Sequence, residues 1–254
     1  MTTWHYTLEP EPLSGPRNMA VDEFLFRKAA ESGGTFLRFY RWSGPTVSLG
    51  ASQNVEKVLD AEACRRRGVA VVRRITGGKL VLHQQELTYC VASADTSVFP
   101  ASVRESYRLI SQALIRGLEE MGLRPSLAGN PPESYLRGIQ PCFAHPARDE
   151  IEIDGKKIVG SAQKRSGAVF LQHGSLPLKK TDDLLQTVSR GTDGRPVLMT
   201  SLSEALGRPI DFFWAAGRLE TGFRNIFSVE LVPYDPAHEN PAALAELENR
   251  YALS

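Results

Sequence analysis

The sequence is poor in cysteine. Its 254 residues include only three, Cys64, Cys90 and Cys142, and these are widely separated. Three scattered cysteines exclude a disulfide-stabilised scaffold and a zinc site built from paired cysteines. We therefore expect free thiols in a reducing compartment, which places the protein in the cytoplasm.

Long apolar runs and an excess of charge are also missing. No run of apolar residues approaches the roughly 18 that a membrane-spanning helix needs. The first residues do not show the basic stretch and apolar core of a signal peptide. The formal net charge is +1, which gives no support for bulk binding to nucleic acid. We expect neither a membrane nor a nucleic acid among the partners.

The composition is that of a folded protein, with 42% hydrophobic and 23% charged residues. Hydrophobic spacing and turn residues predict both helices and strands. The predicted helices cover residues 18–32, 58–67, 102–121, 181–189, 201–206, 212–226 and 241–251. The predicted strands cover residues 35–42, 46–50, 69–74, 79–83, 87–91, 150–159 and 169–176. Because the order lacks regular βαβ alternation, we predict an α+β fold with a mixed, mainly antiparallel sheet in a single domain, residues 1–254.

The clearest local signal is a hairpin within residues 150–159. Two apolar, β-prone segments flank Asp154 and Gly155. This dipeptide tolerates the positive φ angles of a two-residue hairpin turn. Lys157 therefore lies on the second strand of a predicted hairpin.

A second signal is the glycine pair that follows the strand at residues 69–74. Gly77 and Gly78 after Thr76 allow the backbone to approach a ligand closely. Arg73 and Arg74 add charge beside the pair, which would otherwise be a simple hairpin turn with solvated arginines. The segment is neither a P-loop nor a dinucleotide-binding fingerprint, because the required glycine spacing is absent.

Histidines offer weaker signals. His83 stands at a strand end, where a histidine is more often structural than catalytic. A zinc site made of Cys142, His145, His83 and His173 is disfavoured, because the spacing provides no tight ligand pair. We expect no metal.

The three thiols differ in setting. Cys90 lies in a predicted strand and is expected to be buried, and Cys64 stands beside exposed arginines, whose charge solvent should screen. Cys142 lies in a loop between Pro141 and Phe143, and Lys157 follows fifteen positions later. A nearby cation stabilises the thiolate, which is the attacking species. If the two side chains meet, the enzyme carries its substrate as a thioester.

Two stretches of small residues, 160–163 and 172–175, accompany predicted strands. They would permit a narrow slot for an extended chain, or simply close strand packing. Basic clusters at residues 65–67, 73–74, 164–165 and 179–180 are either solvated surface or a docking face for an acidic partner.

Taken together, these motifs resemble the lipoate/biotin attachment superfamily over roughly residues 14–226. The matching segments are residues 18–23, 42–50, 53–54, 73–83, 86–89, 155–163 and 172–175. The resemblance implies a catalytic core at residues 31–226, a helical tail at 227–254, and a sheet curled around a narrow apolar tunnel.

Within that superfamily, the chain is most similar to the cysteine-dependent octanoyltransferases. The resemblance implies that Cys142 is the nucleophile and that Lys157 stabilises its thiolate. It also implies octanoyl transfer from acyl carrier protein to a lysine of lipoyl domains, such as glycine-cleavage H protein, in lipoate biosynthesis, without a cofactor. The implied substrate-binding residues are Arg73, Arg74, Thr76, Gly77, Gly78, His83, Gly160, Ser161, Ala162, Gln163, His173 and Gly174.

Three other functions are compatible with the same residues. An ATP-dependent lipoate–protein ligase would use Lys157 at an acyl-adenylate and leave Cys142 as a bystander. An amidotransferase would move octanoyl groups between lipoyl domains with the same cysteine chemistry, and a carrier-binding module would lack chemistry altogether. Oxyanion donors are expected near either Gly77–Gly78 or Gly160–Ser161.

Overall fold

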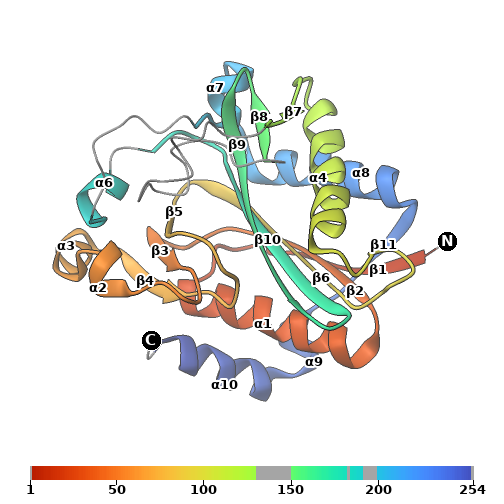
Figure 1. Cartoon of the computed structure of the whole chain (residues 1–254), viewed down its shortest axis with the longest axis horizontal. Helices are drawn as coiled ribbons and strands as arrows, with labels where there is room; N and C mark the ends of the chain where they lie inside the picture. The colour runs from red at the N-terminus through yellow and green to blue at the C-terminus, as the bar shows by residue number, and fades with distance from the viewer. Residues whose placement is uncertain (1, 130–149, 182–183, 191–198, 253–254) are drawn as a thin grey trace.

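A computed structural model describes residues 2–129, 150–181, 184–190 and 199–252 (Figure 1). Its centre is an eight-stranded sheet of order β11-β1-β2-β6-β10-β9-β8-β7. The strands are β1 (Thr2–Leu8), β2 (Thr35–Tyr40), β6 (Glu86–Ser93), β7 (Ser126–Leu127), β8 (Ile151–Ile153), β9 (Lys156–Ser166), β10 (Val169–Pro177) and β11 (Val229–Pro233). The β11–β1–β2 pairings are parallel and the others antiparallel, so the predicted mixed, mainly antiparallel sheet is confirmed.

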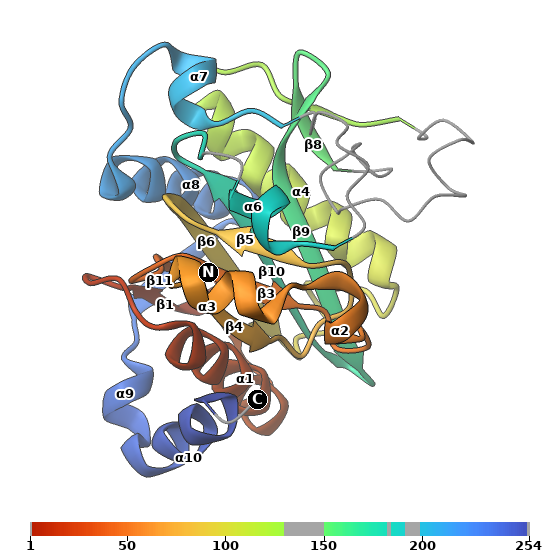
Figure 2. The ribbon, with the colours of Figure 1, turned by 90° about the vertical axis from the view of Figure 1, so that its left-hand side faces the viewer.

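Two pairs of helices cover opposite faces of this sheet (Figure 2). The helices are α1 (Gly15–Ser32) with α10 (Pro241–Ala252), and α4 (Val103–Glu119) with α8 (Phe212–Phe227). Successive residues of a strand point to opposite faces. Accordingly, Phe36 and Tyr40 of β2 pack with the α1 side, whereas Leu37 and Phe39 pack with the α4 side. The alternation therefore divides the interior into two hydrophobic cores.

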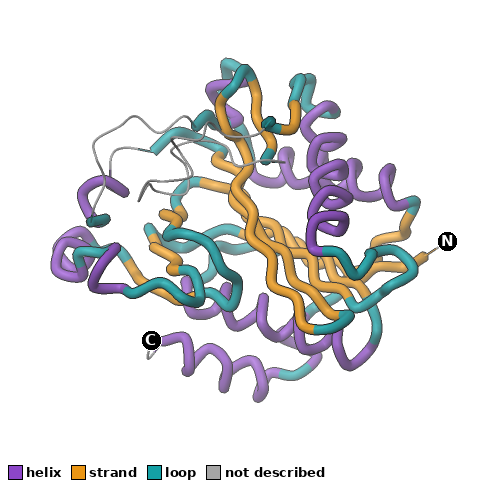
Figure 3. The backbone as a smooth tube through the Cα atoms, in the orientation of Figure 1, coloured by secondary structure: helices purple, strands orange, loops and turns teal. Residues whose placement is uncertain are grey.

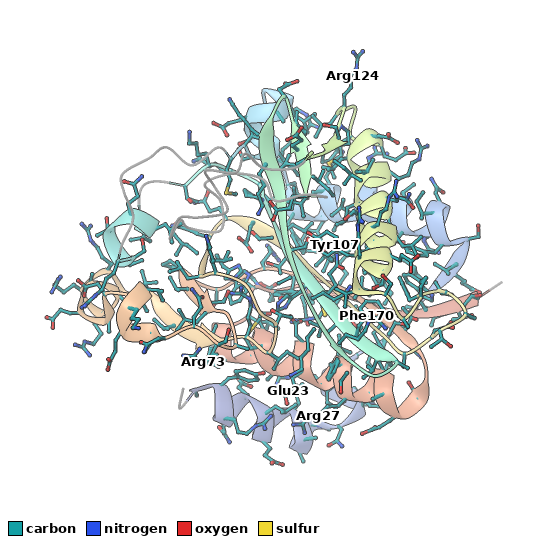
Figure 4. The ribbon with its side chains drawn as sticks, viewed as in Figure 1. Glu23, Arg27, Arg73, Tyr107, Arg124 and Phe170 are labelled. Carbon is teal, nitrogen blue, oxygen red and sulfur yellow. The ribbon has the colours of Figure 1, made fainter. Side chains whose placement is uncertain are left out.

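The helix ends follow from local sequence. Ser14 caps the first turn of α1, and Gly33 ends the helix in the left-handed conformation with φ +71°. Glu23 of α1 accepts hydrogen bonds from Tyr251 at 2.6 Å and Arg250 at 2.9 Å, which tie α10 to α1. Figure 4 shows Glu23 on α1 at its junction with α10.

A smaller sheet of order β4-β3-β5 lies beside the large one (Figure 3). Its strands are β3 (Thr46–Leu49), β4 (Ala70–Arg73) and β5 (Val81–His83). A separate hydrophobic cluster joins this sheet to the short helices α2 (Val55–Val58), α3 (Ala61–Arg67) and α6 (Leu184–Val188). The glycine loop at residues 76–79 connects β4 to β5.

Several sequence predictions need adjustment. The N-terminal strand β1 was not predicted, and the expected helical tail contributes β11 before α9 (Pro236–Glu239) and α10. The helix predicted over residues 58–67 is divided into α2 and α3, whereas the predicted helix at 201–206 is α7 (Leu202–Leu206). The hairpin turn is confirmed, with φ +50° at Asp154 and +73° at Gly155. The limits of the catalytic core stay a prediction.

None of the described helices combines the length and the apolar character that a membrane span requires.

Candidate functional site

A pocket lies where β9 and β10 of the large sheet meet the small sheet. It encloses about 510 Å³, part of which is open to solvent. A pocket between two packed sheets, lined by a few convergent polar groups, is a candidate substrate site.

The structure brings together nine of the predicted site residues at the pocket wall. They are Arg74, Gly78, His83, Lys157, Gly160, Ser161, Ala162, His173 and Gly174. Arg73, Thr76, Gly77 and Gln163 do not belong to this lining. Cys142, the predicted nucleophile, lies outside the described residues.

Sequence reasoning missed seven other residues of the wall. They are Met19, Tyr40, Trp42, Ser48, Val81, Thr88 and Ser175. All except Tyr40 lie inside the segments that carry the family resemblance, so those segments contained the signal. Tyr40 occupies a predicted strand, and its place at the pocket follows from the tertiary fold.

Lys157 is buried in the wall, with 1% of its surface exposed. Its Nζ donates a hydrogen bond to Glu150 Oε1 at 2.6 Å, and the two groups form an ion pair. The backbone carbonyl of Lys157 accepts a hydrogen bond from the Thr200 amide at 2.9 Å. The chain around Thr200 therefore covers the lysine backbone on one side while Glu150 holds its charged end.

Arg74 was expected either to add charge beside the glycine pair or to be a solvated arginine of a hairpin turn, and the second alternative is wrong. Arg74 is 5% exposed and is directed into the protein. Its guanidinium donates to the carbonyl oxygens of Ser48 at 2.9 Å, and of Gly77 and Lys79 at 2.8 Å each. It thus holds the glycine loop against β3, because one rigid cation satisfies several backbone carbonyls at once.

Arg73 also donates hydrogen bonds to backbone carbonyl groups. Its Nη1 donates to the carbonyl oxygens of Gly50 at 3.0 Å and Gln53 at 2.8 Å. The two arginines therefore shape the loops on either side of β4.

His173 on β10 lies in a chain of buried hydrogen bonds. Its Nδ1 is 2.8 Å from Asp22 Oδ2, and its Nε2 is 2.7 Å from Thr76 Oγ1. Arg74 Nε donates to the same Thr76 oxygen at 3.1 Å. Burial lowers the pKa of His173, although Asp22 opposes this effect. A neutral imidazole fits this setting, with Thr76 donating to Nε2 and Nδ1–H donating to Asp22.

Asp22 is the charged end of this chain. Burial alone would raise the pKa of its carboxyl, but contacts with His173, Arg38 and Tyr40 outweigh burial and lower it. Arg38 donates to Asp22 at 3.0 Å and Tyr40 donates at 2.9 Å. The carboxylate therefore stays ionised beneath the pocket.

A second chain of the same kind passes through His83. Its Nδ1 lies 2.8 Å from Glu86 Oε1, and its Nε2 lies 2.7 Å from Ser48 Oγ. Arg74 donates to that serine oxygen at 3.1 Å, and Trp42 stacks on the imidazole at 4.0 Å between ring centroids. The two chains meet at Arg74, so we interpret both histidines as supports of the glycine loop.

Gln163 lies in a third set of polar contacts. It donates to Gln172 at 3.0 Å, and Gln172 donates to the Tyr89 hydroxyl at 2.8 Å. That hydroxyl lies 2.7 Å from Ser161 Oγ. These bonds fix the side chains of β9 and β10 beside the pocket.

The two described cysteines do not resemble nucleophiles. Cys64 and Cys90 are buried, and burial raises the pKa of both thiols. In the described part of the chain, no group of three or more His, Cys, Asp or Glu side chains could hold a metal ion.

This fold and pocket place the chain in a known class. The family model for the lipoyl protein ligase A/B catalytic domain matches residues 14–224, and the chain belongs to this family. Solved structures agree on the fold. Lipoate-protein ligase A bound with ATP superposes with a TM-score of 0.81 at 21% identity, covering 99% of this chain and 96% of that one. A bipartite lipoate protein ligase from Thermoplasma acidophilum gives 0.77 at 20% identity, covering 99% and 94%.

Sequence relatives give a finer comparison. Octanoyltransferase LipM of Moorella thermoacetica is 38% identical over 93% of this chain and 91% of the relative. Octanoyltransferase LipM of Brevibacillus brevis is 35% identical over 99% of this chain and 97% of the relative. The similarity thus extends over nearly the whole length of both proteins.

Proposed function

We propose that the chain is an octanoyltransferase of lipoate biosynthesis that works in the cytoplasm. The donor is octanoyl acyl carrier protein, and the acceptor is a lysine of a lipoyl domain such as glycine-cleavage H protein. The observation that carries this proposal is Lys157, a buried lysine in the wall of the pocket between the two sheets. The long similarity to octanoyltransferases supports the same reaction.

The proposed reaction has two steps. Cys142 loses its thiol proton, and its sulfur attacks the carbonyl carbon of the donor thioester. The bond to the carrier's sulfur breaks, and that sulfur takes up a proton. The acceptor amine then attacks the Cys142 thioester, the amide bond forms, and the cysteine sulfur leaves and takes up the proton that the amine loses. A thioester already carries the acyl group in activated form, so the proposal requires neither ATP nor a metal.

Lys157 is the proposed electrostatic partner of this cysteine. A buried ammonium group stabilises a nearby thiolate more strongly than an ammonium group in water does. Glu150, the residue just before β8, accepts a hydrogen bond from the Lys157 ammonium at 2.6 Å. The acyl chain would occupy the apolar part of the pocket, where burial contributes about 0.8 kcal/mol per methylene.

The oxyanion needs donors, and two glycine backbones at the pocket wall are candidates. Arg74 holds the Gly77 carbonyl at 2.8 Å. In a trans peptide the next N–H points the opposite way, so the Gly78 N–H is turned away from Arg74. This fixed orientation favours the Gly78 N–H as the hydrogen-bond donor to the oxyanion, with the Gly160 N–H as the alternative.

One assay distinguishes the proposal from its competitors. Purified chain is mixed with a lipoyl domain and one of three donors: octanoyl carrier protein, octanoic acid with ATP, or an octanoylated lipoyl domain. We expect mass gain on the acceptor with the first donor and without ATP. Transfer only from the free acid with ATP would identify a ligase, and transfer only from the third donor would identify an amidotransferase.

A further inference from the structure

The charged partner of Lys157 is a residue that no motif singled out. Glu150 lies just before β8, and its side chain is 10% exposed, compared with 1% for Lys157. The Nζ–Oε1 distance of 2.6 Å is that of a strong charge-assisted hydrogen bond. Only Lys157 of the pair belongs to the pocket lining, so the carboxylate lies behind the ammonium.

The pairing does not follow from simple strand register. In the β8–β9 hairpin, Lys157 lies opposite Glu152, and the register shifts between Ile151 and Glu152. Glu152 instead accepts a hydrogen bond from Ser126 at 3.3 Å, in an exposed position. A register shift of this kind redirects side chains and is common beside active sites. Here the shift lies beside the ion pair, in which Lys157 binds Glu150 and not Glu152, the residue opposite it in the hairpin.

A buried ammonium requires such a partner. Removal of a lysine from water favours its neutral form unless an opposite charge is close. Among the described residues of the pocket wall, the other charged or titratable side chains are Tyr40, Arg74, His83 and His173. None of these is an anion, so they do not replace the carboxylate of Glu150.

We infer that Glu150 is a positioning residue that keeps Lys157 protonated and directs its Nζ at the pocket wall. The inference rests on the proposed function for the role of Lys157 in acyl transfer. Glu150 itself does not belong to the pocket lining. It acts through Lys157, so that the cation is present before any donor binds.

The first measurement does not depend on acyl transfer. Wild type, Glu150→Gln and Glu152→Gln are exposed to a small amine-acylating reagent at about pH 8, and Lys157 modification is quantified by peptide mass spectrometry. Only a neutral amine reacts. We expect Glu150→Gln to raise the modification rate about tenfold, which corresponds to about 1.4 kcal/mol. Glu152→Gln removes a charge from the same hairpin and should match wild type.

The second measurement follows transfer against pH. Glu150→Gln retains an oxygen that can accept the hydrogen bond but lacks the charge. We expect its transfer rate to decline at lower pH on the alkaline side than that of wild type. Glu150→Asp retains the charge on a shorter side chain. It should therefore keep the wild-type pH profile with a lower rate and a wild-type Lys157 modification rate.

The two measurements separate the possible failures. Equal Lys157 modification in wild type and Glu150→Gln overturns the inference. If Glu150→Gln does not fold, a raised modification rate in Glu150→Asp overturns it instead, because that variant keeps the negative charge. Wild-type transfer by Lys157→Ala would contradict the proposed role of Lys157 while leaving the modification result intact.

Discussion

The Nε2 atom of His173 lies 2.7 Å from the Oγ1 atom of Thr76, although 97 positions separate the two residues. This contact joins β10 of the large sheet to the glycine loop between β4 and β5. Because Arg74 donates to the same threonine oxygen, the loop is attached to both sheets through buried groups. The protonation of His173 therefore bears on the stability of the pocket.

The first prediction concerns pH. Burial lowers the pKa of His173 below the value of about 6.5 for an unfolded chain. The unfolded chain therefore binds a proton more readily, and stability should fall as pH decreases below about 6.5. Above that value the contribution is complete. Urea unfolding between about pH 7.5 and 5.5 should show a smaller loss of stability in His173→Gln than in wild type.

His5→Gln is the comparison variant for the urea unfolding of His173→Gln, because burial lowers the pKa of His5 as well. His5→Gln removes a second histidine that lies away from the pocket lining. An identical pH dependence of unfolding in wild type and His173→Gln would show that His173 gains its proton equally in both states.

The second prediction concerns Gly50, which ends β3 against the glycine loop. A side chain at Gly50 would overlap the carbonyl oxygen of Gly78, which is a backbone atom. We expect Gly50→Ala to reduce the free energy of unfolding by about 1–3 kcal/mol, because it displaces the loop. Gly44→Ala is the control, since nothing lies within 4 Å of its added carbon. Equal thermal unfolding midpoints for the two variants would refute the close approach.

The third prediction concerns docking of an acidic carrier protein. Arg74 is buried and therefore does not belong to the candidate docking surface. The guanidinium of Arg165 already donates hydrogen bonds to Pro100 and Ser106. Arg65 and Arg66 stay available, with side chains 75% and 63% exposed. Their ion pairs with Glu62 are exposed and therefore weak.

We expect kcat/KM for the carrier-protein donor to fall steeply between low and about 0.3 M salt, while kcat changes little. Octanoyl-CoA should show a weaker dependence, because it has no extended acidic face. Charge reversal by Arg65→Glu with Arg66→Glu should reduce kcat/KM for the carrier protein. Arg124→Glu, on a side chain that extends into solvent elsewhere (Figure 4), should not. A parallel loss with both donors would place the salt effect outside docking.

Local chemistry made part of this structure predictable from sequence. The Asp154–Gly155 turn and the end of α1 at Gly33 depend on backbone preferences that neighbouring residues determine. The alternation of apolar residues likewise identified the central strands. These features require no knowledge of distant contacts.

Other features depend on residues far apart in the chain. Strand β1 pairs with β11 across more than 200 positions, and a short polar strand gives little signal by itself. Arg74 was assigned to the surface because its acceptors, such as Ser48 and Gly77, become neighbours only after folding. The Glu150–Lys157 pair was missed because the residue opposite Lys157 in the hairpin is Glu152, not Glu150.

The central claim is that Cys142 carries the octanoyl group, and intact-protein mass spectrometry tests it most directly. The chain is mixed with octanoyl carrier protein in the absence of ATP and of any acceptor. We predict a gain of one octanoyl group in wild type, Cys64→Ala and Cys90→Ala, and no gain in Cys142→Ala. Undiminished acylation and transfer in Cys142→Ala would contradict the account.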